Sequence, residues 1–392
     1  MVKNRQFKRR VMWLAMLLLS TALGFFLFVP GIVERQSNKV TLSTHKISDR
    51  AIALHKSLFV ADLHGDTLLW QRDLLSRSNQ GHIDLPRLQE GNVALQVFAS
   101  VTKTPKGQNY DANSADSDNI TLLAFAQLQP PRTWTSLLER SLWHAEKLHD
   151  AKTRNSSLII IRTKNDLVGL IARRKVKGGG TGALLASEGL QSLEGKFSNL
   201  DVLYNAGYRM AGLTHFFDNE LAGSMHGLRK GGLTPLGRDV MNAMEAKGMV
   251  VDIAHASHSA VAEILASATK PVVSSHGGVQ ATCKVNRNLT DEEIKGVAKT
   301  GGVIGIGYWD GAICSTDPAA IAKAIKHVRD LVGIDHVGLG SDFDGATTTP
   351  FDTAGLAHVT QALLDAGFTD ADIAKVMGGN VLRVLLAVLP AA

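Results

Sequence analysis

The sequence predicts a (β/α)₈ barrel, because short apolar runs alternate with amphipathic segments along most of its 392 residues. The amphipathic segments have helical spacing and include 259–269, 291–300, 318–332 and 370–388. Several of the runs are apolar throughout, which is typical of parallel strands that helices cover on both faces. In all, eight short apolar runs are found, at 58–63, 93–100, 183–187, 210–214, 249–254, 271–275, 302–307 and 336–341. Eight strands that alternate with helices over about 340 residues match a barrel with insertions.

Composition excludes several other classes of protein, and one missing motif disfavours the alternative fold. With 45% hydrophobic and 20% charged residues, the chain is neither disordered, nor collagen-like, nor a small disulfide-stapled protein. A doubly wound open sheet is the alternative fold. No Gly-x-Gly-x-x-Gly motif follows the run 58–63, which disfavours a dinucleotide-binding version of that sheet.

The first 40 residues account for the whole net charge of +6, because they contain seven basic residues and one acidic residue. Five of the basic residues precede Val11, and residues 11–30 carry no charge. About 20 apolar residues span the ~30 Å hydrocarbon core of a bilayer, and basic flanks stay cytoplasmic. We therefore expect a transmembrane signal-anchor at 11–30 and a body outside the cytoplasm, in the periplasm. A cleaved signal peptide is the alternative, although the end of the run is bulky and lacks an Ala-x-Ala site.

These features predict two regions. Residues 1–40 form a basic tip, an anchor and a polar tether, and residues 41–392 form the barrel domain; the polar stretch 31–50 is assigned to the tether. The barrel domain is formally neutral, so it has no electrostatic footprint for nucleic acid. Export also favours a disulfide between Cys283 and Cys314, the only two cysteines, over two buried free thiols.

Three connecting segments can be interpreted individually. The long, turn-rich stretch 101–135 follows the second strand, so it is expected to overhang one end of the barrel. The glycine-rich stretch 177–182 precedes a strand and lacks Gly-Lys-Ser/Thr, which favours a turn over a phosphate loop. Thr290 precedes Glu293 by three residues, which predicts a capping box at the start of the helix 291–300.

Polar side chains follow six of the eight predicted strands. Active sites of such barrels form at the carboxyl ends of the strands, so these side chains are expected to converge. Alternation along a strand places His64 and Asp66 on one face. In strand order the residues are His64 and Asp66, Glu188, His215, His255, His276 and Asp342.

A metal explains five of these residues better than separate structural roles do. His64, Asp66, Glu188, His255 and His276 would be costly to bury without a partner. Imidazole and carboxylate ligands without thiolate suit Zn²⁺ first, with Mn²⁺ or Co²⁺ as alternatives. Five protein ligands exceed the usual three of a catalytic zinc, so we expect two ions about 3.5–4 Å apart that share a carboxylate.

Other polar residues are expected to have structural roles. Glu194 is expected to be solvated, and Asp344 to cap a helix or brace a loop. Six further histidines are interpreted as exposed or loop residues: His82, His144, His149, His327, His336 and His358.

The chain resembles the renal (membrane) dipeptidases over residues 50–388. The segments that carry the resemblance are 60–66 (VADLHGD), 187–189 (SEG), 213–215 (LTH), 251–255 (VDIAH), 274–276 (SSH), 287–288 (RN) and 340–345 (GSDFDG). The resemblance implies a TIM barrel with a two-zinc site that hydrolyses the amide bond of dipeptides. It further implies that His64 and Asp66 bind one zinc, that His255 and His276 bind the other, and that Glu188 bridges them.

The same resemblance implies roles for four more positions and marks one difference. His215, Arg287 and Asp342 would bind substrate and support catalysis, and Cys283 and Cys314 stand where the family has a disulfide. The stretch 308–313 (YWDGAI) departs from the tyrosine-rich mammalian version, which bears on side-chain specificity.

The expected mechanism is attack by a zinc-bridged hydroxide on the substrate amide. His215 would stabilise the oxyanion, Asp342 would move a proton or hold the substrate amine, and Arg287 would bind the free carboxylate. One alternative is another binuclear amidohydrolase acting on non-peptide amides, lactones or esters. In such enzymes the first ligand motif along the chain is usually His-x-His, and a carboxylated lysine often bridges the two metal ions. A membrane-tethered, non-catalytic binding protein is the second alternative, although it would be expected to have lost ligands. A homodimer is compatible with the sequence.

Overall fold

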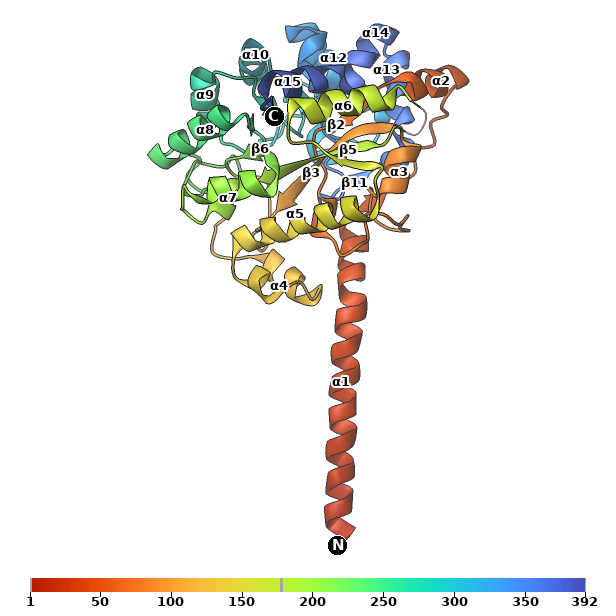
Figure 1. The fold of residues 1–392 in the computed structure, drawn as a ribbon, viewed down its shortest axis with the longest axis vertical. Coiled ribbons are helices and arrows are strands. Elements are labelled where there is room, and N and C mark those ends of the chain that lie inside the picture. Colours follow the sequence, from red (N-terminus) through yellow and green to blue (C-terminus); the bar gives the residue numbers. More distant parts are fainter. Residues whose placement is uncertain (1, 177–178, 392) are drawn as a thin grey trace.

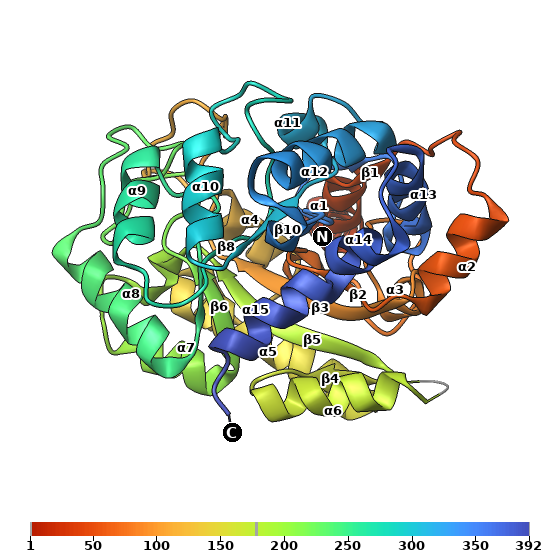
Figure 2. The same ribbon diagram turned by 90° about the horizontal axis from the view of Figure 1, so that it is seen from above.

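The computed structural model describes residues 2–176 and 179–391 and confirms the predicted barrel (Figures 1 and 2). All eight predicted strands are present, and all their pairings are parallel. The order β3-β2-β10-β9-β8-β7-β6-β5 closes through pairing of β3 with β5. The strands are β2 (Val60–Asp62), β3 (Val93–Val101), β5 (Thr181–Glu188), β6 (Tyr208–Gly212), β7 (Val250–Asp252), β8 (Val273–Ser274), β9 (Val303–Ile306) and β10 (Val337–Leu339).

Helices surround this barrel. Those between the strands are α3 (Leu85–Glu90), α4 (Asn119–Ala126), α5 (Leu137–Arg154), α6 (Lys164–Arg174), α7 (Asn199–Ala206), α8 (Pro235–Lys247), α9 (His258–Ser267), α10 (Asp291–Lys299), α11 (Asp310–Ile313) and α12 (Pro318–Val332). Before the first barrel strand comes α2 (Asp49–Ser57), and after the last come α13 (Ala357–Asp365), α14 (Asp370–Ala374) and α15 (Asn380–Val388).

The predicted helices 259–269, 291–300 and 318–332 correspond to α9, α10 and α12. The Thr290–Glu293 capping box is formed at α10. The predicted helix 370–388 is instead divided into α14, a π-helical turn (Lys375–Gly379) and α15. The division occurs where the backbone passes close to Phe59, since a Cβ on Gly378 would lie 2.0 Å from the Phe59 carbonyl oxygen.

Three additional short strands were not predicted from the sequence. β4 (Leu158–Ile160) pairs with the start of β5 outside the closed barrel, and β1 (Lys39–Val40) pairs with β11 (Thr348–Thr349). Two and three residues are too short to show a strand period. The predicted turn 177–182 lies in part outside the described residues, because 177 and 178 are not described.

The two ends of the barrel are closed differently. At the amino ends of the strands, Val381, Val384 and Leu385 of α15 pack in one apolar cluster with strand residues that include Ala61 and Val303. Figure 1 shows a long helix, α1 (Val2–Ser37), leaving the body at the end opposite α15. The end from which α1 leaves is therefore the carboxyl end of the strands, where the candidate site residues stand.

The segment 31–50 differs from the polar tether that the sequence predicts. Helix α1 continues to Ser37, and Glu34, which is only 2% exposed, forms an ion pair with Arg72. The Asn38 side-chain carbonyl accepts a hydrogen bond from the backbone N–H of Ala346. These partners lie far along the sequence, so a polar composition could not distinguish a docked segment from a free one.

Candidate active site

Two buried carboxylates shape the carboxyl end of the barrel without facing the centre of the site. Asp62 accepts hydrogen bonds from the backbone N–H of His64 and from the N–H and hydroxyl of Ser341, which joins the ends of β2 and β10. Asp252 does the same between β7 and β8, with the backbone N–H groups of Ala254 and Ser275 as donors. Burial raises the pKa of both carboxyls, and these donors partly offset the rise. Neither residue has a role that its sequence position predicts.

The centre of the site is a group of imidazoles around Glu188. The Glu188 Oε1 atom lies 3.0 Å from His255 Nε2 and 3.3 Å from His276 Nε2. The same oxygen lies 3.5 Å from both His64 Nε2 and His215 Nε2. His64 Nε2 is also 3.4 Å from an Asp66 oxygen. The structure thus brings the five predicted ligands together, and it brings His215 equally near.

The ligand atoms form three overlapping groups that are compact enough to hold an ion. These groups are His64–Asp66–Glu188, Glu188–His215–His255 and His64–His276–Asp342, each with its ligand atoms within 4.8 Å of one another. His64 Nε2 and Asp66 Oδ1 are buried and have no hydrogen-bond partner among the described residues. Buried polar atoms without a partner are costly, and coordination of a cation would satisfy them.

The electrostatics of the site also favour a cation. Burial and the charge of Glu188 raise the pKa of Asp66 to about 6, and burial together with Asp66 raises the pKa of Asp342 well above its usual range. Burial also acts to raise the pKa of Glu188, but the charges of His215 and His64 and hydrogen bonds from His255 and His276 hold it well below its usual value. A cation beside three crowded carboxylates relieves their mutual repulsion.

The two remaining predicted ligands, His255 and His276, have the protonation state that metal binding requires. Burial lowers the pKa of His255 and His276 well below the usual value, so both imidazoles are neutral at pH 7. A neutral imidazole is the form that coordinates a metal. His255 and Asp342 also have left-handed backbones, with φ of 65° and 58°. Such strain in non-glycine residues is typical of functional sites.

Arg287 is part of the wall of the site. It lies in the loop after β8 and is only 2% exposed. Its Nη2 donates to the carbonyl of His276 at 2.9 Å, and its guanidinium lies 5.7 Å from the Trp309 ring. The guanidinium is therefore fixed beside a candidate metal ligand.

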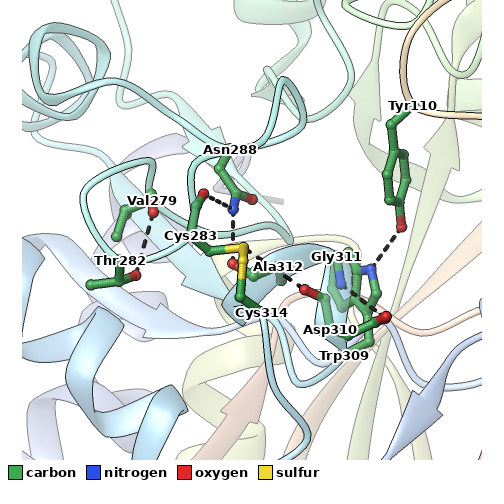
Figure 3. The surroundings of a disulfide bond; sticks show 10 residues. All are labelled: Tyr110, Val279, Thr282, Cys283, Asn288, Trp309, Asp310, Gly311, Ala312 and Cys314. Atoms are coloured by element: carbon green, nitrogen blue, oxygen red, sulfur yellow. Dashed lines mark hydrogen bonds between the residues drawn. A yellow bond between two sulfur atoms is a disulfide. The ribbon is translucent and has the colours of Figure 1, made fainter.

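The disulfide joins the loop after β8, which carries Arg287, to the segment after β9, which carries Trp309. Figure 3 shows the bond and the residues around it. Cys283, after β8, is bonded to Cys314, after α11, with a Cα–Cα distance of 5.3 Å. The Asn288 side-chain amide donates to the carbonyls of Cys283 and Ala312, which holds the same two loops together. The predicted disulfide is confirmed.

The stretch 101–135 lies over this end of the barrel, as predicted. The Lys103 carbonyl is 3.3 Å from His215 Nδ1, and the Tyr110 carbonyl is 2.9 Å from His226 Nδ1. The Tyr110 hydroxyl accepts a hydrogen bond from the Trp309 indole at 2.9 Å. Tyr110 and His226 were not predicted as site residues, because neither stands directly at a strand end.

One prediction about a structural residue was wrong. His144 lies on α5 and is fully buried, with its Nδ1 paired with the Ser100 hydroxyl at 2.7 Å. His82 lies in a loop, as expected, although its side chain is fully buried. Glu194 is exposed, as expected, and its Oε1 also accepts hydrogen bonds from the Ser136 hydroxyl and two N–H groups at the start of α5. The prediction for Asp344 as a brace is confirmed, because it accepts hydrogen bonds from Arg72 and from the His82 and Ile83 backbones.

A parallel barrel with buried imidazoles and carboxylates at the carboxyl ends of its strands defines the class of metal-dependent TIM-barrel hydrolases. Residues 48–391 match the membrane dipeptidase family, peptidase family M19, and the chain belongs to this family. The resemblance inferred from the motifs is thereby confirmed. As a member, the chain is a metal-dependent hydrolase of dipeptides.

Known relatives agree with this assignment. The chain is similar to the dipeptidase aclJ of Aspergillus oryzae, with 28% identity over 357 residues that cover 83% of this chain and 77% of the relative. The fold is similar to that of the probable dipeptidase PvdM from Pseudomonas aeruginosa, with a TM-score of 0.72, 20% identity and coverage of 88% and 98%. It is also similar to a metallo peptidase from Rhodobacter sphaeroides, solved with a phosphinate mimic of L-Ala-D-Ala, with a TM-score of 0.71, 22% identity and coverage of 84% and 99%.

Proposed function

We propose that this chain hydrolyses dipeptides with two zinc ions, held by His64 and Asp66 on one side and His255 and His276 on the other. Glu188 would be shared, and its position between both pairs, 3.0–3.5 Å from the imidazole nitrogens of all three histidines, is the observation that supports this assignment. When bound, the ions would acidify a coordinated water toward a pKa of about 7 and polarise the substrate carbonyl.

His215 is proposed to stabilise the oxyanion that develops on the substrate. Its Nδ1 faces the Lys103 carbonyl, which can only accept a hydrogen bond, so Nε2 can donate only when the ring is an imidazolium. Burial lowers the pKa of His215, and the neighbouring Glu188 charge offsets this only in part, so the negative charge that develops on the substrate would have to favour the imidazolium. A metal-ligand role is the competing assignment for His215 Nε2, and counting bound ions in a His215 variant separates the two.

Arg287 and Asp342 are proposed to select and orient the substrate. The planar guanidinium of Arg287 is suited to a free carboxylate, which limits substrates to very short peptides. Asp342 has a raised pKa, so its protonated form is available to deliver a proton to the leaving amine; as a carboxylate it would hold the substrate's amino group.

We further propose that α1 is a single-pass anchor with a cytoplasmic N-terminus and a periplasmic body. Its apolar side chains are left uncovered, for example Leu14 at 58% and Leu19 at 72% exposure, unlike those of a core helix. The basic residues before Val11 favour this orientation. Protease added to intact spheroplasts should digest the body, and complete protection would overturn the topology. A shortened soluble form would indicate signal cleavage.

The deciding experiment combines metal analysis of the full chain with a panel of L,L and L,D dipeptides. We expect about two zinc ions per chain and hydrolysis of at least part of the panel. Glu188→Gln should lower the metal content well below two and abolish the activity. Glu194→Gln, six residues further along and outside the cluster, is the matched control and should retain both. Two retained ions and full activity in Glu188→Gln would refute the assignment.

A further inference from the structure

Helix α4 lies beside the apolar part of α1, as Figure 1 shows. The Phe125 ring of α4 contacts the Phe26 ring of α1, with a centroid distance of 5.3 Å. Elsewhere a hollow of about 190 Å³ lies between the two helices, and it is lined mainly by apolar side chains, among them Val29 and Val33 of α1 and Leu122 and Leu123 of α4.

Apolar side chains of this segment remain largely exposed even though α1 lies beside it. Leu122 is 64% exposed, Phe125 is 38% exposed, and Leu128, just after α4, is 62% exposed. No charged residue occurs between residues 119 and 131. Single exposed apolar residues are ordinary, but three neighbours on one uncharged helical segment form a patch that calls for a partner.

The segment is also held rigidly. Arg140 of α5 is 1% exposed and donates to an Asp118 carboxylate oxygen and to the Thr121 hydroxyl. It also donates to the carbonyls of Thr102 and Thr133. The exposed face of α4 is therefore presented by a fixed element and is not the product of a frayed loop.

We propose that Leu122, Phe125 and Leu128 enter the surface of the same bilayer that α1 spans, as a second membrane contact. This inference rests on the proposed anchor. The partner is lipid because the patch continues the exposed apolar surface of α1. Phe25 and Phe26 lie near the end of the charge-free run 11–30, so α4 stands level with the boundary between acyl chains and headgroups.

This contact would fix the catalytic end of the barrel toward the membrane. Helix α1 is joined to that end by the Glu34–Arg72 ion pair and by the pairing of β1 with β11. The stretch that leads into α4 carries Lys103 and Tyr110, which contact the site wall. Substrates would then reach the metal site sideways, through the space between barrel and bilayer.

The test uses the full chain in liposomes of phosphatidylethanolamine and phosphatidylglycerol. A single environment-sensitive fluorophore is attached to Leu128→Cys, to Val168→Cys or to Leu19→Cys. The native cysteines do not interfere, since the described residues include no free cysteine. Val168 is the matched control because it is 55% exposed on α6, near the α15 end of the body (Figure 1).

We expect lipids with a nitroxide near the headgroup to quench the label at position 128, and aqueous iodide to quench it several-fold less than the label at 168. Nitroxides deep in the acyl chains should quench the label at 19. Equal access of iodide to 128 and 168, with quenching retained at 19, would overturn the α4 contact alone. Protection of the label at position 128 from both quenchers would show that protein covers the patch. This result would also overturn the proposed contact of α4 with the bilayer. Loss of quenching at 19 would refute the anchor and this inference together.

Discussion

Breaking the bond between Cys283 and Cys314 should lower stability by an amount that the loop length sets. The bond closes a loop across a sequence separation of 31 residues. In the chain-entropy treatment, a loop of that length corresponds to roughly 4 kcal/mol of stabilisation. With an unfolding entropy of about 2.1 cal/mol/K per residue over about 340 residues, the melting temperature should fall by about 6 °C.

The variants for this test are Cys283→Ala, Cys314→Ser and the double mutant. Each single change already removes the bond, so the double mutant should melt close to either single one. Scanning calorimetry is run with and without a chelator, which separates loss of the bond from loss of metal. Reduction of the native protein should reproduce the shift, and the double mutant should not respond to the reductant.

The same change should affect substrate binding more than turnover. The bond joins the loops that carry Arg287 and Trp309, while Asn288 still connects their backbones. We therefore expect KM for dipeptides to rise while kcat changes little. A melting temperature within about 1 °C of the native value in both the double mutant and the reduced protein would refute the entropy argument. Free thiols in unreduced, unfolded protein would refute the bond itself.

Three further predictions concern the site and its surroundings. His215→Ala should keep about two ions per chain while kcat falls on the order of 10²–10³-fold, and loss of metal would make His215 a ligand. Arg287→Ala should weaken hydrolysis of dipeptides with a free carboxylate and hardly affect a dipeptide amide; equal losses would return Arg287 to a purely structural role. The hydrogen bond that His258 donates to Glu293 raises the pKa of His258, so the pair's contribution to stability is complete below the unfolded pKa of about 6.5 and is lost as pH rises through the folded pKa. The difference in unfolding free energy between native protein and His258→Gln should accordingly shrink from pH 5.5 to 8.5, and a difference independent of pH would contradict the assignment.

The strands and the convergence of the site residues were predictable because both follow from local patterns. Each barrel strand is a short apolar run, and His64, Glu188, His255 and His276 directly follow such runs. A closed parallel barrel then brings every strand end to one place, so their meeting required no knowledge of side-chain contacts.

What the sequence could not show depends on partners that are distant along the chain. Asp62 is positioned by Ser341, and Tyr110 by Trp309, across 279 and 199 residues. The burial of His144 likewise depends on Ser100 of a neighbouring strand. No periodic pattern encodes such pairs, so a histidine on a helix looked the same whether it faced solvent or the barrel.

The contacts of residues 34–43 with the body fix how the N-terminal helix is attached to it. Arg72 pairs with Glu34 of α1 on one side and with Asp344 on the other, and Asp344 stands two residues beyond Asp342. The side chains of Glu34, Arg72 and Asp344 are buried, and the two ion pairs of Arg72 offset the cost of burying their charges. Displacing any one of the three would therefore leave a buried charge less well paired. A polar tether would let the body rotate freely above a membrane. The ion pairs and the β1–β11 pairing instead connect α1 to the loop that carries a proposed catalytic residue. The orientation of the active site relative to α1 is therefore a property of the fold, and removal of α1 through Asn38 would remove one partner of Arg72 beside the site itself.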